Sequence, residues 1–311
     1  MAQKDMTIGW IGAGRMGIQL ATRLIEAGYD LSVYNRTKEK LQPLVDMGAK
    51  AVDSPAELAD CDLVFSMVSA SKDLKQVMLG DGGLLTAGTS PKIIADSSTV
   101  SIEASAEIRE AAAEKGTEFL ATPVSGNPAV IAAGKLTVAV SGPKKVYEEV
   151  LPVLEVFGRG VTYVGDGEVA RLVKIAHNVF LGVVTQSLAE ITILAEKGGV
   201  TREAFLNFLN DSVMGSVFTQ YKSPAFVNLD FTPTFTMPLL LKDFDLGLSA
   251  SSTLGVPMPI ASATRQIVAQ ESGKGNTEED FATLLLTVAS GAGMQLKSEN
   301  SSITDGLDPE S

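Results

Sequence analysis

Three glycines near the N-terminus have the spacing of a phosphate-binding turn. Gly12, Gly14 and Gly17 form a GxGxxG pattern that follows an apolar run and opens a helical pattern. The first glycine allows a tight bend, the second lets the backbone approach a pyrophosphate, and the third lets the helix pack on the sheet. Since a helix N-terminus attracts anions, the pattern predicts a dinucleotide site that includes Arg15 and Met16 in the first helical turn.

The residues after the second apolar run indicate which dinucleotide is bound. Asn35, Arg36 and Thr37 stand where an Asp or Glu would bind the ribose hydroxyls of NAD and repel a 2′-phosphate. Here the position is neutral, and Arg36 offers a planar fork of donors to a phosphate. The sequence therefore favours NADP(H) over NAD(H), with a solvated loop arginine as the alternative interpretation of Arg36.

A lysine on the strongest helical pattern could transfer a proton. Lys174 lies among apolar residues, and Asn178 follows it by four residues, on the same helical face. Burial of the ammonium at an interdomain cleft would lower the pKa of Lys174 toward the range useful for proton transfer. A lysine that extends to solvent is the simpler interpretation. We expect His177, on another face, to be a hydrogen-bonded structural residue.

Hydroxyl-rich loops follow three predicted strands, where an open α/β sheet presents its ligand crevice. Met67 and Val68 end one strand and residues 96–99 follow the next, so both loops are predicted to line the cofactor. The simpler interpretation of Ser98 and Thr99 is that they cap the helix that begins near Ser101, and both roles can coexist. Residues 122–127 contain turn formers and backbone N–H groups that can bind a carboxylate, although an ordinary turn is the simpler interpretation.

These residues require an alternating α/β unit followed by a helical one. Apolar runs alternate with helical patterns until about Glu168, after which the strand pattern disappears and long helical periodicities follow. The fold class is therefore α/β, an N-terminal Rossmann-type doubly wound sheet plus a C-terminal all-α domain. The predicted strands are residues 6–11, 31–34, 63–68, 93–95, 118–120, 136–140 and 161–164. The predicted helices are residues 15–27, 38–47, 102–115, 144–157, 169–196, 202–211, 239–253, 259–271 and 278–289.

The length of 311 residues fits two packed units. The change of pattern near residues 165–167 predicts a dinucleotide-binding domain at residues 1–164 and an all-helical substrate and dimerisation domain at residues 165–290. Residues 291–311 are polar and lack an apolar period, so we expect a disordered tail.

Composition excludes several classes of protein. The 25 Lys+Arg against 37 Asp+Glu give 25 − 37 = −12, a charge that repels nucleic acid and anionic lipid. A single histidine argues against a metal site and against a Ser-His-Asp triad. The lone Cys61 and an N-terminus without an apolar signal region lead us to expect a cytoplasmic protein. The apolar stretch 179–195 is interrupted by polar residues, which favours a buried helix over a membrane span.

With these residues in order, the chain resembles the β-hydroxyacid dehydrogenase family, which includes 3-hydroxyisobutyrate dehydrogenases, tartronate semialdehyde reductases and glyoxylate/succinic semialdehyde reductases. The resemblance runs over about residues 6–290 and rests on five blocks in family order. The blocks are the GxGxMG turn with Asn35–Thr37, Asp96–Thr99, Pro123–Asn127, Lys174–Asn178, and Phe235 with Lys242-Asp243. The Lys174–Asn178 block is also similar to the 6-phosphogluconate dehydrogenases, a related branch of the superfamily.

The resemblance implies a role for each block. Lys174 would be the general acid/base, with Asn178 as its hydrogen-bonding partner, and Ser125 would help to hold the reacting substrate. The implied substrate-binding residues are Ser125, Gly126, Asn127, Phe235 and Asp243. The implied cofactor-binding residues beyond the glycine turn and residues 35–37 are Met67, Val68, Thr99 and Lys242.

The chain departs from the family pattern at several positions. Ala121-Thr122 stand where an Asp is common, and Asn127 replaces the last glycine of the substrate loop. Glu168 and Ala170 replace two glycines before the lysine. These changes leave the chemistry in place and leave the exact substrate open.

The expected activity is that of an NADPH-dependent reductase, running reversibly as a dehydrogenase, on a short semialdehyde or β-hydroxy acid. One alternative is an imine reductase, although in those enzymes another residue type commonly replaces the helix lysine, and this chain keeps Lys174. Another is a non-catalytic NADP-binding module, for which a damaged Lys174 or Ser125 would be expected. A homodimer formed through the apolar helix would bury that helix on several sides, and a tetramer stays open as well.

Overall fold

The computed structural model describes residues 6–307, and internal contacts divide the chain into two units, residues 1–174 and 175–311. The boundary lies ten residues after the predicted one, because the start of helix α7 (Val169–Lys197) belongs by its contacts to the first unit. Ala170, for example, packs in the core of that unit. The first unit is a Rossmann-type sheet and the second is helical, so the predicted fold class is confirmed.

The sheet of the first unit has the strand order β3-β2-β1-β4-β5-β6-β8-β7, with β9 beside β8. Strands β3 to β6 in this order pair in parallel, whereas β8 runs antiparallel to β6 and β7. The strand order reverses direction between β1 and β4, which is where a doubly wound sheet opens a ligand crevice. The strands are β1 (Ile8–Ile11), β2 (Leu31–Tyr34), β3 (Lys50–Ala51), β4 (Leu63–Ser66), β5 (Ile93–Asp96), β6 (Glu118–Ala121), β7 (Val124–Ser125), β8 (Thr137–Ser141) and β9 (Gly160–Gly165).

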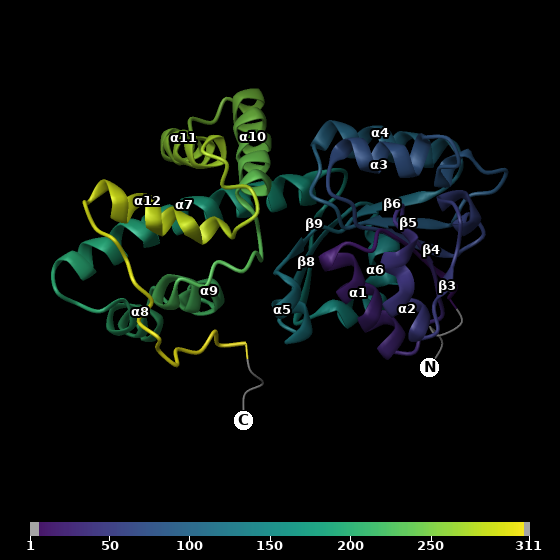
Figure 1. Ribbon diagram of the computed structural model, residues 1–311. Helices are drawn as coiled ribbons and strands as arrows, with labels where there is room; N and C mark the ends of the chain where they lie inside the picture. The colour runs from purple at the N-terminus through teal and green to yellow at the C-terminus, as the bar shows by residue number, and fades with distance from the viewer. Residues whose placement is uncertain (1–5, 308–311) are drawn as a thin grey trace. The chain divides into compact units, whose positions relative to one another are not determined.

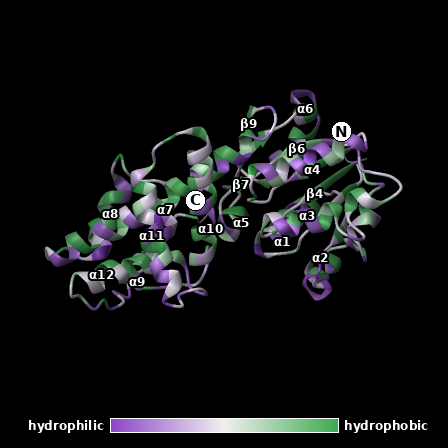
Figure 2. Ribbon diagram, turned by 90° about the horizontal axis from the view of Figure 1, so that it is seen from above, coloured by the Kyte–Doolittle hydropathy of each residue, from purple (hydrophilic) through white to green (hydrophobic). Residues whose placement is uncertain are grey.

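Helices cover both faces of this sheet (Figure 1). Helices α1 (Arg15–Glu26), α2 (Gln42–Asp46) and α6 (Lys144–Leu154) lie over one face, and α3 (Ser71–Leu79) and α4 (Ile102–Glu114) over the other. Figure 2 shows hydrophobic and hydrophilic residues recurring along these helices, as expected when one side of a helix is buried. Short elements complete the unit: α5 (Pro128–Ala132), η1 (Lys38–Leu41), η2 (Pro55–Leu58), η3 (Leu84–Thr86) and η4 (Glu155–Phe157).

The second unit is built around α7. Two apolar clusters flank this helix, one with α8 (Arg202–Asp211), α9 (Val217–Asn228) and α12 (Leu284–Gly291), the other with α10 (Met237–Leu254) and α11 (Pro259–Gly273). The turn η5 (Phe281–Thr283) leads into α12. Among the described residues, α7 is the helix long and apolar enough to cross a membrane, and half of its most apolar window is buried inside the protein. A core helix gives the same pattern.

The structure adds elements that the sequence pattern did not predict. Strands β3 and β7 are two residues long, and α5 has five residues, too short to show a period. Helix α9 contains Pro224, which usually breaks a helix. A capping box between Ser216 and Thr219 starts this helix, and burial of Phe226 and Val227 keeps it folded.

The C-terminal segment differs from the predicted disordered tail. The Glu299 carboxylate accepts the backbone N–H groups of Arg202 (2.8 Å) and Glu203 (2.9 Å) at the start of α8. The Asn228 amide donates to the Ser301 carbonyl (2.9 Å). Residues 292–307 therefore lie against α8 and α9. The predicted tail ends at 311, and residues 308–311 lie outside the described part of the chain.

Asp62, which lies just before β4 and is partly exposed, gives a pH-dependent test of stability. Its carboxylate accepts from the Thr7 N–H (3.0 Å) and from the Lys92 ammonium (2.6 Å), and these bonds, led by Lys92, lower the pKa of Asp62 to about 2. A carboxyl group with a lowered folded pKa stabilises the fold above its unfolded pKa, and the contribution is lost as pH falls through the folded value. We expect Asp62→Asn to destabilise the protein at pH 7 by about 1 kcal/mol, since solvent screens the pair. Thermal melts should show the difference between variant and wild type shrinking from pH 4 to pH 2, and a constant difference would contradict this account.

Candidate functional site

The turn after β1 is shaped by glycines at two positions. Gly12 has φ +104°, and a Cβ there would lie 2.2 Å from the carbonyl oxygen of Met67. A Cβ at Gly17 would lie 2.1 Å from the Gly12 carbonyl oxygen. The Trp10 indole N–H donates to that same carbonyl (2.8 Å). The fold itself therefore requires both glycines, whatever the turn binds.

Gly14 differs from these two glycines, because no contact within the described chain requires a glycine at this position. Its backbone is extended, and among residues 6–307 no atom lies within 4 Å of the place a Cβ would take. Gly14 is also the N-cap of α1, whose first turn has no side-chain cap and no acidic residue within the described structure. Open space in front of uncapped N–H groups fits a pyrophosphate. Arg15 is exposed beside this space, while Met16 packs on the core beneath it.

Asn35 links the end of β2 to the glycine turn. Its side-chain oxygen accepts the Ala13 N–H (2.9 Å), and its amide nitrogen donates to the Thr37 carbonyl (2.7 Å). These bonds shape the loop, a role that the prediction of direct cofactor binding did not include. Arg36 remains 87% exposed, with its guanidinium 3.6 Å from the Asp73 carboxylate at the start of α3. The charge of Arg36 is therefore exposed to solvent at the end of β2, which is where the 2′-phosphate of a bound NADP would lie.

The loops after β4 and β5 are joined to each other. The Ser98 hydroxyl accepts the Val68 N–H (2.9 Å) and donates to the Asp96 carboxylate (2.7 Å). Ser98 is fully buried, while Met67, Val68 and Thr99 are partly exposed. The predicted cap on the next helix is made instead by Ser101, which accepts the Ala104 N–H (3.2 Å). The two predicted cofactor loops therefore form one connected surface.

The loop after β6 holds a helix cap as well as the predicted substrate residues. Gly126 has φ +148°, and a Cβ there would lie 2.7 Å from the Leu136 side chain. The Asn127 side-chain oxygen accepts the Val130 N–H (2.9 Å) and is buried with α5. That oxygen is therefore engaged in capping, which explains why an asparagine can replace the family's glycine. Ser125 is partly exposed and Gly126 is exposed.

Sequence reasoning missed Arg171, which lies three residues before Lys174 in α7. Its side chain is 1% exposed and forms a 2.6 Å ion pair with the Asp96 carboxylate, whose side chain is fully buried. The contact joins residues 75 positions apart. Lys174 itself is partly buried and is the last residue of the first unit. An arginine inside an apolar helical run was the signal that could have been followed, because a buried guanidinium needs a partner.

In the second unit, α7 and α10 approach closely and bring two predicted residues together. A Cβ at Gly182 would lie 2.5 Å from the Phe244 ring, and one at Gly247 would lie 2.3 Å from the Val179 side chain. This close approach lets the Asn178 amide donate to the buried Asp243 carboxylate (2.5 Å). The family resemblance implied that Asn178 is a hydrogen-bonding partner of Lys174, and it did not imply the bond to Asp243.

The hydrogen bond between Asn178 and Asp243 has a charged or polar neighbour at each end: Lys242 beside Asp243, and His177 beside Asn178. Lys242 lies 3.2 Å from the second oxygen of Asp243. His177 is exposed, and its Nδ1 lies 3.0 Å from the Asn178 side-chain oxygen. Because the amide nitrogen of Asn178 faces a carboxylate, its oxygen faces the imidazole, so Nδ1 carries the proton in this arrangement. The predicted hydrogen-bonded histidine is therefore observed, although it is at the surface.

Phe235 is held by a buried ion pair. The Lys222 ammonium donates to the Asp280 carboxylate (2.6 Å), and both residues are at most 2% exposed. Asp280 also accepts the Phe235 N–H (3.2 Å), while the Phe235 ring meets the Phe281 ring edge to face at 5.7 Å. Burial lowers the pKa of Lys222, and the Asp280 carboxylate opposes that shift. The loop that carries Phe235 is thus fixed.

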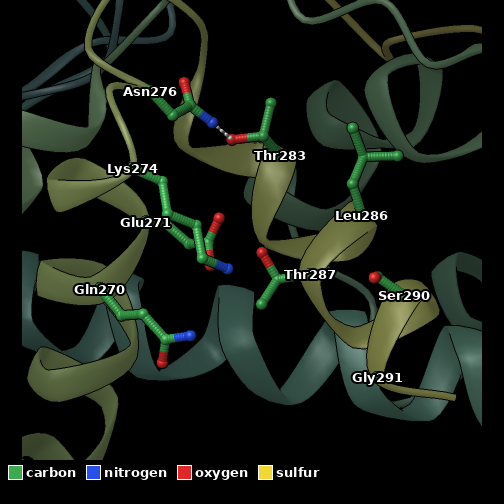
Figure 3. Close-up of a pocket in the computed structure, with 9 residues that line it drawn as sticks. All are labelled: Gln270, Glu271, Lys274, Asn276, Thr283, Leu286, Thr287, Ser290 and Gly291. Atoms are coloured by element: carbon green, nitrogen blue, oxygen red, sulfur yellow. Dashed lines mark hydrogen bonds and ion pairs between the residues drawn. The ribbon is translucent and has the colours of Figure 1, made fainter.

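A separate hollow of about 540 Å³ opens between α11 and α12 (Figure 3). Lys274 donates to Glu271 (2.8 Å), and Asn276 donates to Thr283 (2.8 Å), while the buried side-chain oxygen of Asn276 has no hydrogen-bond partner within the described structure. The residues around it are Gln270, Glu271, Lys274, Asn276, Thr283, Leu286, Thr287, Ser290 and Gly291. Within the described structure this lining shares no residue with the predicted site.

Comparisons with known proteins agree with the two-unit architecture. Residues 7–165 match the family profile described as the NAD binding domain of 6-phosphogluconate dehydrogenase. Residues 165–288 match the profile described as NAD-binding of NADP-dependent 3-hydroxyisobutyrate dehydrogenase.

Individual proteins resemble nearly the whole chain. Over 285 residues it is 32% identical to 2-(hydroxymethyl)glutarate dehydrogenase of Eubacterium barkeri, covering 91% of this chain and 95% of that protein. Over 281 residues it is 31% identical to chloroplastic glyoxylate/succinic semialdehyde reductase 2 of Arabidopsis thaliana, covering 90% and 78%. The crystal structure of 3-hydroxyisobutyrate dehydrogenase from Salmonella typhimurium superposes with a TM-score of 0.82 at 26% identity, covering 91% and 100%.

The contrast between Gly14 and Gly17 gives a direct test of the dinucleotide turn. We expect Gly14→Ala to leave the melting temperature nearly unchanged but to weaken NADPH binding at least tenfold, because the new methyl group enters the open space. Gly17→Ala serves as the matched variant and should destabilise the fold by about 1–3 kcal/mol through overpacking. Fluorescence titration with NADPH and thermal melts measure both effects. Unchanged NADPH affinity in Gly14→Ala would contradict the assignment.

Proposed function

Since the chain belongs to the β-hydroxyacid dehydrogenase family of NAD(P)-dependent dehydrogenases and reductases, we propose that it reduces a short carboxylated aldehyde with NADPH and oxidises the corresponding hydroxy acid in reverse. The observation that carries this proposal lies within the first unit. The open space at Gly14, the joined loops after β4 and β5, and the helix that bears Lys174 all occur at the carboxyl ends of the parallel strands. That edge is where such sheets bind dinucleotides.

The substrate class follows from the relatives and from the loop after β6. The names of the relatives include glyoxylate, succinic semialdehyde and 2-(hydroxymethyl)glutarate, which all carry a carboxylate. In this chain, the Ser125 hydroxyl and the exposed backbone at Gly126 offer donors for such a group. We therefore assign a short semialdehyde as the substrate to be reduced.

The proposed mechanism assigns proton transfer to Lys174. When bound, the nicotinamide supplies the hydride that adds to the carbonyl carbon. The Lys174 ammonium donates its proton to the carbonyl oxygen as negative charge develops there, and the amine takes the proton back during oxidation. Ser125 and the Gly126 N–H orient the substrate and stabilise that charge. Asn178, whose amide is held by Asp243, positions the helical turn that follows Lys174.

The cofactor preference rests on Arg36. Its guanidinium is exposed at the end of β2, and the neighbouring Asn35 carries no charge to repel a phosphate. Gly14 and the first turn of α1 would hold the pyrophosphate, while Met67, Val68 and Thr99 would lie beside the nicotinamide.

We further propose a cytoplasmic homodimer that forms through α7. Phe180, Ile191 and Leu194 lie 11 and 3 residues apart along one stripe of this helix and are 69%, 40% and 74% exposed. A second copy would cover this stripe. Burial raises the pKa of the Cys61 thiol, which disfavours its thiolate form and is compatible with a reducing compartment.

Lys174→Ala tests the proton transfer. We expect kcat with succinic semialdehyde to fall about 10²–10⁴-fold, the usual effect of removing a positioned acid, with the Kd for NADPH nearly unchanged. Lys197→Ala, at the other end of α7, is the matched control and should retain kcat. Steady-state kinetics over a small panel of semialdehydes, with a cyclic imine included, provide the measurement. Near-normal kcat in Lys174→Ala would overturn the mechanism, and preferential turnover of the imine would favour the imine reductase alternative.

Arg36→Ala tests the cofactor preference. The variant should lose at least tenfold in affinity for NADPH, because it removes the donors for the 2′-phosphate, while NADH affinity changes less than twofold. Lys40→Ala removes a nearby positive charge and should alter both affinities little. Equal losses for the two cofactors in Arg36→Ala would show that Arg36 does not bind the phosphate.

Leu194→Glu tests the oligomer. The wild-type protein should elute at twice the chain mass in size-exclusion chromatography with light scattering, and the variant should elute as a monomer because a carboxylate cannot be buried in an apolar contact. A monomeric wild type at micromolar concentration would refute the dimer.

A further inference from the structure

The buried carboxylate of Asp96 forms hydrogen bonds with several segments at the carboxyl ends of the central strands. One oxygen of Asp96, the last residue of β5, accepts the hydroxyls of Ser66 (2.5 Å) and Ser98 (2.7 Å). Its other oxygen accepts an N–H of the Arg171 guanidinium (2.6 Å). The Asp96 carbonyl accepts the Thr122 N–H (2.8 Å), which fixes the end of β6 as well. The carboxylate is fully paired and belongs to the framework.

The planar guanidinium of Arg171 donates hydrogen bonds to β5, to the loop after β5 and to α4. Besides Asp96, its guanidinium donates to the Ser98 carbonyl (2.7 Å) and to the Ser105 hydroxyl in α4 (3.0 Å). Glu168, which directly precedes α7, places a carboxylate oxygen 3.8 Å from the same guanidinium. A lysine could satisfy one of these partners but not all of them, because an ammonium has no fork.

These bonds determine where the first turns of α7 lie. Arg171 precedes Lys174 by three residues, so the two Cα atoms are about one turn apart on the helix. Holding Arg171 against Asp96 and Ser98 therefore fixes the height and rotation of the helix at Lys174. The same Ser98 holds Val68 through its hydroxyl (2.9 Å), so α7 and the loop after β4 share one anchor.

We propose that Arg171 is a positioning residue for proton transfer: its buried bonds to Asp96 and Ser98 set the position of Lys174 relative to the loops after β4 and β5. This inference deepens the proposed function and rests on Lys174 as the proton donor. A general acid must be held within hydrogen-bond reach of the oxygen that it protonates, and a displacement of about 1 Å can reduce the rate about 10²-fold.

The test compares Arg171→Gln with a matched buried arginine. Arg202, with a fully buried side chain, pairs with Glu196 (2.7 Å) and donates to the Val227 carbonyl (3.0 Å), all within the second unit. Both Arg171→Gln and Arg202→Gln should lower the melting temperature, because each removes a fully buried guanidinium from an ion pair and leaves the carboxylate without its charged partner. With succinic semialdehyde and NADPH, we expect kcat to fall about 10²-fold in Arg171→Gln and less than twofold in Arg202→Gln. A fall in kcat that is the same in both variants would overturn the proposal.

A double mutant identifies the group through which Arg171 acts. In a Lys174→Ala background, Arg171→Gln should change kcat less than threefold, because the displaced group is already absent. Independent, multiplying losses would overturn the proposal while leaving Lys174 as the acid. Near-normal kcat in Lys174→Ala alone would instead overturn the proposed function, so the two failures can be told apart.

Arg171→Lys keeps the proposal testable if the glutamine variant does not fold. The ammonium keeps the charge opposite Asp96 but loses the fork, so we expect a smaller fall in melting temperature than in Arg171→Gln, with kcat reduced at least tenfold. The primary deuterium isotope effect on kcat with 4-deuterated NADPH should rise as the chemical step becomes rate-limiting. Full kcat and an unchanged isotope effect in Arg171→Lys would contradict the positioning role.

Discussion

The Asp96 carboxylate is fully buried, and the structure around it follows from the need to pair that charge. An unpaired ion in the interior is costly, so every oxygen of such a group must find donors. Here the donors come from β4, from the loop after β5 and from α7. Strands β4 and β5 already pair in the sheet, with Ser66 opposite Asp96. The buried charge adds to them the start of α7, which lies 75 residues further along the chain.

Other polar contacts occupy two positions at which the chain departs from the family pattern. Glu168 replaces a glycine, and its carboxylate accepts Arg109 from α4 (2.6 Å). Ala170 replaces another, and its N–H donates to the Ser141 hydroxyl at the end of β8 (3.0 Å) while its methyl group packs in the core. The start of α7 is therefore joined to α4 and to the end of β8 at two positions where the family resemblance led us to expect glycines. This chain obtains a defined helix start by polar contacts.

Elements defined by local sequence patterns could be predicted, whereas hydrogen bonds between side chains far apart in the chain could not. The GxGxxG turn, the apolar strands and the long helices follow from spacing within about 20 residues, so they were predicted. Arg171 was missed because its partner is 75 residues away and its own surroundings are apolar. Asn127 and Asn35 were assigned to ligands, yet their side chains first satisfy backbone N–H groups. The tail was predicted as disordered because its contacts with Arg202 and Asn228 depend on tertiary structure.

The central claim is that the Lys174 amine protonates the substrate oxygen. A crystal structure with NADP⁺ and a non-reactive β-hydroxy acid analogue tests it most directly. The account predicts the Lys174 Nζ atom within about 3 Å of the analogue's hydroxyl oxygen, next to the reactive carbon of the nicotinamide. A Lys174 side chain directed into bulk solvent, with another group or water bonded to that oxygen, would contradict it.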